Sequence, residues 1–234
     1  MRDELHPSGF ELVDVCLEMG GADVARRWVD EALSIYPPLS LHPSLLDQSH
    51  LMDARFGVTN IPMVLWIDES GTVVRGPEPA TPPAVGATAE GMVQLIGDGE
   101  FREKYAAKLR DWVAKGAESQ YAYEPDEVLA RSKPTSPAIS QAAAHFEIAQ
   151  HIWRRDGLSE LALAHFNAAH ELQPANITYK RQAYSYVGVE RSGDEDWGRF
   201  RQAPEEGEDW PFVSDFNRDL IAHDPALAKK LGLT

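Results

Sequence analysis

The chain has 234 residues and a mass of 26.0 kDa, and its 43% hydrophobic residues are enough for one large domain or two modest ones. Its formal net charge of −15 argues against binding to nucleic acid or to an anionic membrane surface, because both require clustered Lys and Arg, and it favours solubility and a basic partner. A single cysteine excludes an intrachain disulfide and a Cys-rich zinc site, and without a long apolar run or a signal peptide the chain is expected in the cytoplasm, away from membranes.

The first elements predict a strand and two helices. Residues 9–18 are rich in Val and Leu with few breakers, which predicts a mostly buried strand. Two glycines lead into a predicted helix over residues 22–33 with one apolar face. A proline-rich connection follows, and a short helix over residues 45–55 is predicted to end at Gly57.

Two strands joined by a tight turn come next. Residues 63–68 predict a buried strand, and residues 72–76 predict a short strand that pairs with it antiparallel. Residues 77–91 are too rich in Pro, Ala and Gly for regular structure and predict an exposed loop, after which residues 99–116 predict a helix. The order of elements over residues 1–116 predicts an α/β domain built on a mixed sheet with helices on its faces.

The second half of the chain predicts helices. A polar linker over residues 117–138 includes one short predicted helix at residues 126–131. Residues 139–190 predict a helical hairpin whose two helices meet through small and aromatic side chains. These are Phe146, Ala149 and Trp153 on the first helix and Ala162, Phe166 and Ala169 on the second, with Gly157 in the turn and Pro174 as the stop. The pattern resembles a single tetratricopeptide repeat, which implies an all-α region.

The acidic tail, residues 191–234, is predicted to dock onto another surface. About three such repeats are usually needed for an independent stack, so a lone hairpin requires a surface to pack against. The tail carries Trp197, Trp210 and Phe212 within a charged segment, which indicates docking and not a free arm. Short helices are predicted at residues 214–222 and 225–231.

Residues 56–74, FGVTNIPMVLWIDESGTVV, carry a second resemblance, together with the strand at residues 9–18 and the helix before Gly57. The order and spacing of these elements are similar to those of thioredoxin-like thiol-disulfide oxidoreductases of the bacterial cytochrome-maturation type. The similarity covers roughly residues 1–115, about half the chain. The residues that match the family pattern are Phe56, Gly57, Val58, Pro62, Ile67, Asp68 and Gly71.

This resemblance implies an incomplete thioredoxin-like fold with a cis-proline at Pro62. In the family this proline borders the redox site and helps to bind the backbone of a substrate. The resemblance therefore implies a peptide-binding edge formed by Thr59, Asn60, Ile61 and Pro62, in which Ile61 offers main-chain groups to an extended peptide.

The chain departs from the family at the active site. The family's Cys-x-x-Cys pair opens a helix that precedes the counterpart of residues 9–18, and neither that helix start nor the strand before it has a match here. Three alternatives stay open: the strands at residues 9–18 and 63–68 pair directly, a strand comes from elsewhere, or the recorded start omits a natural N-terminal segment. Cys16 is predicted in mid-strand, where apolar surroundings raise the pKa of a thiol, so it does not replace the pair.

Other groups of residues give at most a weak signal for a metal site, and none for a cofactor or a catalytic centre. His145 and His151 lie six residues apart and His165 and His170 five apart, so neither pair shares a helical face as an i, i+4 zinc pair does. No phosphate-binding glycine loop, nucleophile elbow or Ser-His-Asp order is recognisable. A weak candidate for metal binding consists of His42, His50, Asp47 and Asp53.

We therefore expect a redox-inactive or N-terminally truncated thioredoxin-like protein that binds a protein or peptide through the Pro62 edge and the helical hairpin. One alternative is a thiol-disulfide oxidoreductase whose Cys-x-x-Cys lies upstream of Met1. Another is a structural homodimer that forms through the sheet edge left open by the missing strand, because an unpaired strand is a template for association.

Overall fold

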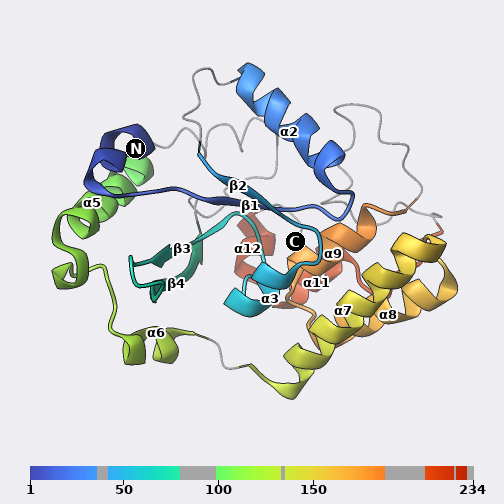
Figure 1. Ribbon diagram of the computed structural model, residues 1–234. Helices are drawn as coiled ribbons and strands as arrows, with labels where there is room; N and C mark the ends of the chain where they lie inside the picture. Colours follow the sequence, from blue (N-terminus) through green and yellow to red (C-terminus); the bar gives the residue numbers. More distant parts are fainter. Residues whose placement is uncertain (36–41, 80–98, 133–134, 188–208, 224, 231–234) are drawn as a thin grey trace. The chain divides into compact units, whose positions relative to one another are not determined.

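The computed structural model describes residues 1–35, 42–79, 99–132, 135–187, 209–223 and 225–230 (Figure 1). The protein is mixed α/β and divides into two units. The first unit consists of Met1–Gly57, Pro62–Pro82 and Ile96–Lys133, and the second of Val58–Ile61, Pro83–Leu95 and Pro134–Thr234. No helix in the described ranges is both long enough and apolar enough to cross a membrane.

The first unit contains all the strands of the described residues. Its elements in chain order are α1 (Arg2–Leu5), η1 (His6–Ser8), β1 (Asp14–Leu17), α2 (Ala22–Ile35), β2 (Ser44–Asp47), α3 (Leu51–Phe56), β3 (Met63–Ile67), β4 (Val73–Pro79), α5 (Gly99–Lys115), η2 (Gly116–Glu118) and α6 (Pro125–Arg131). The predicted helices at residues 22–33, 99–116 and 126–131 are confirmed.

The predicted helix over residues 45–55 is wrong in its first part. Residues 44–47 form β2, which pairs in parallel with β1, and the helix α3 begins only at Leu51. The carboxylate of Asp47 accepts hydrogen bonds from the Ser49 N–H at 3.2 Å and the Met52 N–H at 2.7 Å. Asp47 therefore supplies a partner for a first-turn donor of α3 and fixes where the helix starts.

The strand predicted over residues 9–18 is shorter and more exposed than expected. Only Asp14–Leu17 is extended in a sheet, and the side chains of Val13 and Val15 remain 48% and 36% exposed. Within the described residues β1 pairs with β2 and β3 with β4, so two separate two-stranded sheets take the place of the predicted single mixed sheet. Direct pairing of β1 with β3 is not observed there.

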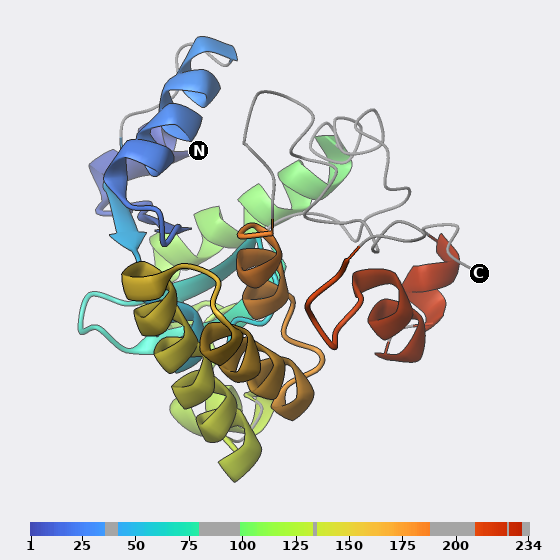
Figure 2. The ribbon, with the colours of Figure 1, turned by 90° about the vertical axis from the view of Figure 1, so that its right-hand side faces the viewer.

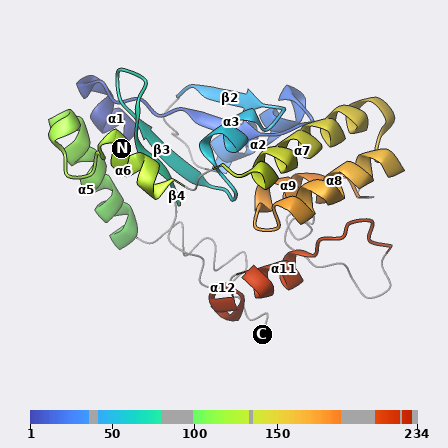
Figure 3. The same ribbon diagram turned by 90° about the horizontal axis from the view of Figure 1, so that it is seen from below.

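The predicted antiparallel hairpin is confirmed (Figure 3). β3 and β4 are joined by a turn in which Asp68 accepts hydrogen bonds from the Ser70 and Thr72 N–H groups, both at 2.9 Å. β4 runs to Pro79, so the first three residues of the predicted loop at residues 77–91 belong to the strand. The rest of that loop lies outside the described residues.

The core of the first unit forms around Trp66 of β3, which is 3% exposed. Helix α5 supplies Tyr105, whose hydroxyl accepts a hydrogen bond from Trp66 Nε1 at 2.9 Å, and Trp112, whose ring stacks on Trp66 with centroids 4.9 Å apart. The guanidinium of Arg75 lies 5.1 Å from the Trp66 ring centroid and is almost buried. Burial of aromatic side chains on one face of α5 therefore holds this helix against the β3–β4 hairpin.

The second unit is helical. Its elements are α7 (Pro137–Asp156), α8 (Glu160–Leu172), α9 (Ile177–Tyr184), α11 (Phe216–His223) and α12 (Pro225–Lys230). Figures 1 and 3 show α7 and α8 side by side and antiparallel. The predicted hairpin helices, and the predicted short helices near residues 214–222 and 225–231, are thus confirmed with small shifts of their ends.

Side-chain caps start three of these helices. Each cap is a Ser or Asn whose side-chain oxygen accepts the N–H three residues further on, which satisfies an otherwise unpaired donor. The pairs are Ser136 with Ile139, Ser159 with Ala162, and Asn176 with Tyr179.

The core of the second unit includes the docked tail. The interface of α7 and α8 is fully buried at the alanines and phenylalanines that the sequence singles out, and Phe146 and Phe166 meet edge to face with centroids 5.6 Å apart. Phe212 is 6% exposed, and Trp210 packs against the same cluster. Docking of the tail is therefore confirmed for Trp210 and Phe212, whereas Trp197 lies outside the described residues.

Candidate functional site

The peptide-binding edge implied by the sequence lies between α3 and β3. Asn60, Ile61 and Pro62 are exposed, with Ile61 45% exposed, and Thr59 is half-buried. The Ile61 N–H donates to the side-chain oxygen of Asn60 at 3.0 Å, and the Thr59 carbonyl accepts the Ile177 N–H at 2.7 Å. Two main-chain groups of this edge therefore already have partners, while the Ile61 and Pro62 side chains face solvent.

Cys16 is the one cysteine of the chain and lies half-buried in β1. Burial raises the pKa of the Cys16 thiol, and the carboxylates of Glu18 and Asp14 raise it further. A thiol must lose its proton to act as a nucleophile, and the surroundings of Cys16 oppose that loss. That Cys16 does not replace a redox pair stays a prediction.

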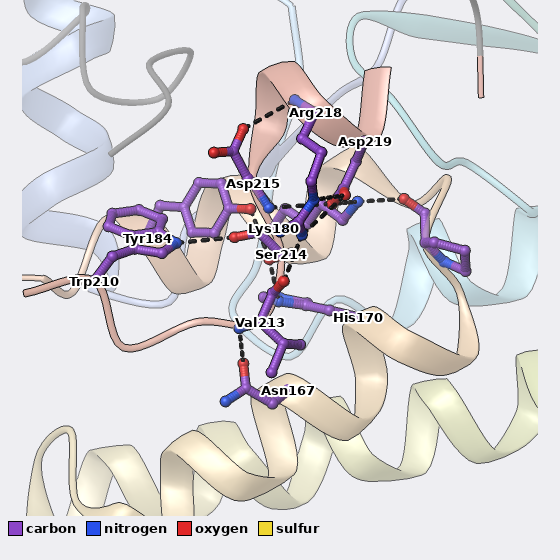
Figure 4. Close-up of polar contacts among 11 residues, drawn as sticks. Asn167, His170, Lys180, Tyr184, Trp210, Val213, Ser214, Asp215, Arg218 and Asp219 are labelled. Atoms are coloured by element: carbon purple, nitrogen blue, oxygen red, sulfur yellow. Dashed lines mark hydrogen bonds and ion pairs between the residues drawn. The ribbon is translucent and has the colours of Figure 1, made fainter. Parts of the chain in front are cut away.

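A second candidate site lies where the tail segment, residues 209–215, packs on α8 and α9 (Figure 2). The side-chain amide of Asn167 on α8 contacts the main chain of this segment at two points. Its nitrogen donates to the Pro211 carbonyl at 3.3 Å. Its oxygen accepts the Val213 N–H at 2.9 Å (Figure 4). One side-chain amide thus binds two main-chain groups of the segment.

Aromatic side chains complete the contact between the tail segment and the helices. The Phe212 ring lies 5.3 Å from the Tyr184 ring and 6.4 Å from the Phe166 ring, centroid to centroid. Trp210 meets Tyr184 edge to face at 4.7 Å, and its indole N–H donates to the Ser214 carbonyl at 2.8 Å. Burial of the Phe212 ring and partial burial of the Trp210 ring help to hold the segment in place.

Ser214 of the segment forms a buried hydrogen-bonded group with His170 of α8 and Tyr184 of α9 (Figure 4). The Ser214 hydroxyl lies 2.8 Å from His170 Nδ1 and 2.6 Å from the Tyr184 hydroxyl. Burial lowers the pKa of His170 to about 3, and the nearby Lys180 ammonium lowers it as well. A serine next to a neutral histidine is reminiscent of nucleophilic catalysis, but all three side chains are at most 4% exposed, so the group is structural.

Lys180 of α9 anchors the helix that follows the segment. Its side chain is 0% exposed, and its ammonium donates to the Asp219 carboxylate at 2.7 Å and to the carbonyl of Pro174. Burial lowers the pKa of Lys180, and the bond to Asp219 opposes this effect. Burial also raises the pKa of Asp219, but the hydrogen bond from Lys180 and the charge of Lys180 outweigh it, so the pKa of Asp219 is lowered overall.

We name the surface formed by Asn167, His170, Lys180 and Tyr184 the tail-binding face. It combines a two-point contact to the backbone, an aromatic cluster and one buried cation. The sequence predicts the docking residues Trp210 and Phe212 but none of the four residues that form the tail-binding face. Polar residues on a helix carry no pattern that reveals what a segment about 40 residues later will contact.

Comparison of the chain with protein-family models, with characterised proteins and with solved structures finds no match.

Proposed function

We propose that this chain is a non-catalytic module that binds a protein or an extended peptide. It combines a thioredoxin-like domain that lacks the redox pair with a tetratricopeptide-like helical hairpin. The observation that carries the proposal is the two-point contact of Asn167 with the main chain of Pro211 and Val213. A helix surface that holds one extended segment in this way is chemically suited to hold another.

The Pro62 edge is the second proposed contact surface. The Ile61 N–H is bonded to the exposed side chain of Asn60, and a carbonyl of an incoming peptide can replace that side chain at little cost. The exposed Ile61 side chain offers apolar area beside the same N–H. These features support a docking edge at Thr59, Asn60, Ile61 and Pro62.

The experiment tests whether the tail-binding face accepts a peptide in trans. The probe is a fluorescein-labelled peptide with the sequence of residues 209–219, titrated with the full chain and followed by fluorescence polarisation. In the wild-type chain the attached tail competes at an effective concentration of up to about millimolar, so the probe should bind weakly. Phe212→Ala removes a buried ring, which costs about 3–5 kcal/mol, and should free the face for the probe.

Two further variants in the Phe212→Ala chain identify the binding surface. Asn167→Ala should reduce probe affinity, whereas Glu171→Ala, an exposed change on the same helix, should not. Circular dichroism checks that each variant keeps its helices. A Phe212→Ala chain that is folded but binds the probe no better than the wild type would overturn the proposal.

The oxidoreductase alternative makes the opposite prediction for thiol chemistry. The raised pKa of Cys16 and the lack of a second cysteine predict no turnover in an insulin-reduction assay with dithiothreitol. Turnover by the purified chain that disappears with Cys16→Ala would contradict the binding-module proposal.

A homodimer is a second candidate, favoured by the exposed apolar face of the β1–β2 sheet. Val15 and Leu45 are register partners, and their side chains are 36% and 51% exposed. Apolar side chains at a sheet surface of this kind favour association with a second copy. Elution as a monomer at micromolar concentration would argue against this candidate.

A further inference from the structure

Two histidines from different helices face each other in the helical hairpin. His145 of α7 and His165 of α8 have their Nδ1 atoms 2.9 Å apart, with ring centroids at 5.1 Å and ring planes inclined by 38°. Both side chains are half-buried, so solvent reaches the pair. The two helices are side by side and antiparallel at this point (Figure 3).

The sequence around the pair explains why the two rings meet. Each histidine directly precedes a buried phenylalanine, Phe146 or Phe166, so each His-Phe step places the phenyl ring in the core and the imidazole at its rim. Fully buried alanines on both helices let the backbones approach closely. The hairpin therefore holds the two imidazoles at a fixed separation.

The observed contact between the two rings is a single hydrogen bond. One hydrogen bond joins two neutral imidazoles only if one carries its proton on Nδ1 and the other presents a lone pair there. Among the described residues neither ring has another hydrogen-bond partner. Neutral imidazole nitrogens are the commonest metal ligands in proteins, and a metal ion accepts lone pairs from both rings at once.

The separation of the nitrogens favours one coordination geometry. Metal–imidazole bonds are about 2.0–2.1 Å long, so two ligands at 90° on a square-planar or octahedral ion lie about 2.9 Å apart, and two tetrahedral ligands about 3.4 Å apart. The hydrogen-bonded Nδ1 atoms of His145 and His165 lie 2.9 Å apart, so the first geometry requires less movement of the two rings than the second. Tetragonal coordination by nitrogen and oxygen is typical of Cu(II) and Ni(II), and Cu(II) binds more tightly.

We propose that His145 and His165 form a binding site for a divalent transition metal, with Cu(II) as the preferred ion. On binding, the ring that carries its proton on Nδ1 becomes the tautomer protonated on Nε2, and the hydrogen bond between the rings breaks. The two Nδ1 lone pairs then occupy neighbouring coordination positions, and water fills the others. Within the described residues no group of three His, Cys, Asp or Glu side chains is positioned around one ion, so the site has two protein ligands. The site is separate from the tail-binding face and does not depend on the proposed function.

The test is a titration of the full chain with CuCl₂, followed by calorimetry and by electron paramagnetic resonance. The wild type should bind one Cu(II) tightly, with a spectrum that shows two equivalent nitrogens. Loss of an outer-shell partner weakens metal binding by about 10–100-fold, so His145→Ala or His165→Ala, which removes a ligand, should cost at least as much. His151→Ala, which removes an exposed histidine from the same helix, should leave the affinity unchanged.

A second measurement links binding to the hairpin. A metal that joins α7 to α8 stabilises the folded chain, so Cu(II) should raise the thermal midpoint of the wild type and of His151→Ala but not of the other two variants. Unchanged Cu(II) affinity in His145→Ala or His165→Ala would overturn the proposal. So would a wild-type spectrum that shows a single coordinated nitrogen.

Discussion

At the scale of single residues, the second unit depends on charged and polar groups that water does not reach. Lys180 has a fully buried side chain, and its partner Asp219 is 15% exposed. A buried ammonium is tolerated only while its partners are in place, because desolvation of a charge costs several kcal/mol. The tail therefore does more than cover apolar area, since it also supplies the counter-charge for α9.

The first prediction compares the removal of one charge of the Lys180–Asp219 pair with the removal of both charges. Asp219→Ala leaves the Lys180 ammonium buried without its carboxylate and should lower the free energy of unfolding by about 3–5 kcal/mol. The double variant Lys180→Met, Asp219→Ala removes both charges and should be more stable than the single variant. Urea unfolding followed by circular dichroism measures both values. Equal stability of the single and double variants would contradict the claim that a buried Lys180 ammonium without its carboxylate destabilises the chain.

The second prediction concerns the pH dependence that His170 imposes. Its pKa is lowered to about 3 in the folded chain, mainly by burial, and is about 6.5 in an unfolded chain. Between these values the unfolded state binds one more proton, so stability is unaffected above pH 6.5 and falls as the pH drops below it. At pH 5 the expected loss from this group is about 2 kcal/mol relative to pH 7.

His170→Gln provides the comparison for this effect. The bond to Ser214 also changes in this variant, which shifts its stability by an amount independent of the titration, so the readout is the difference in unfolding free energy between pH 7 and pH 5. This difference should shrink by about 2 kcal/mol in the variant, as measured by urea unfolding at each pH. An unchanged difference would show that His170 is already charged or exposed in the folded chain.

At the scale of elements, the turn between α7 and α8 places the two helices. Gly157 has φ 71° and ψ −161°, a backbone conformation that is essentially restricted to glycine. Apart from the glycine itself, its chain neighbours and the adjoining helix backbone, no atom of the described residues lies within 4 Å of the position that a Cβ would take there. The glycine is therefore required for backbone conformation and not for space.

The third prediction follows from this conformation. Gly157→Ala should destabilise the chain by about 1–3 kcal/mol, because an L-residue is strained at these angles. Gly157→Asn should recover little of that loss, since Asn tolerates the left-handed helical region but not this one. Urea unfolding of both variants is the measurement. If Gly157→Asn were as stable as the wild type, this would contradict the claim that position 157 requires a backbone conformation restricted to glycine.

The predicted elements with a strong local signal are confirmed, and the wrong first part of the helix predicted over residues 45–55 has a clear cause. The helices over residues 22–33 and 99–116 and the β3–β4 hairpin follow from apolar periodicity and turn residues, which are local properties. Residues 44–47 carry a short apolar run that suits a helix or a strand equally well. Pairing with β1, about 30 residues earlier, decides for the strand.

At the scale of the whole molecule, charge is the dominant feature. The chain has 37 acidic and 22 basic residues and a formal net charge of −15. Such an excess favours solubility but opposes compaction, because like charges repel one another in the folded state. Exposed ion pairs such as Lys104 with Glu100 offset little of this repulsion.

The fourth prediction is that salt stabilises the chain. Raising NaCl from 10 to 150 mM shortens the Debye length from about 30 Å to about 8 Å and screens repulsion between distant carboxylates. The thermal midpoint should therefore rise, as measured by differential scanning calorimetry. Sucrose at the same osmolality serves as the control, because it is excluded from the protein surface but does not screen charges. A midpoint that falls with NaCl would mean that attractive ion pairs dominate.

The sequence by itself determined the division into an α/β half and a helical half, most helices and the β3–β4 hairpin. It also determined the docking role of Trp210 and Phe212 and the lack of a second cysteine. Each of these features depends on composition or on local spacing. Tertiary structure alone decided three other features. These are the β1–β2 pairing, the tail-binding face and the meeting of His145 with His165. Each of them joins residues about 20 to 45 positions apart, and such contacts depend on how elements pack, which no local pattern specifies.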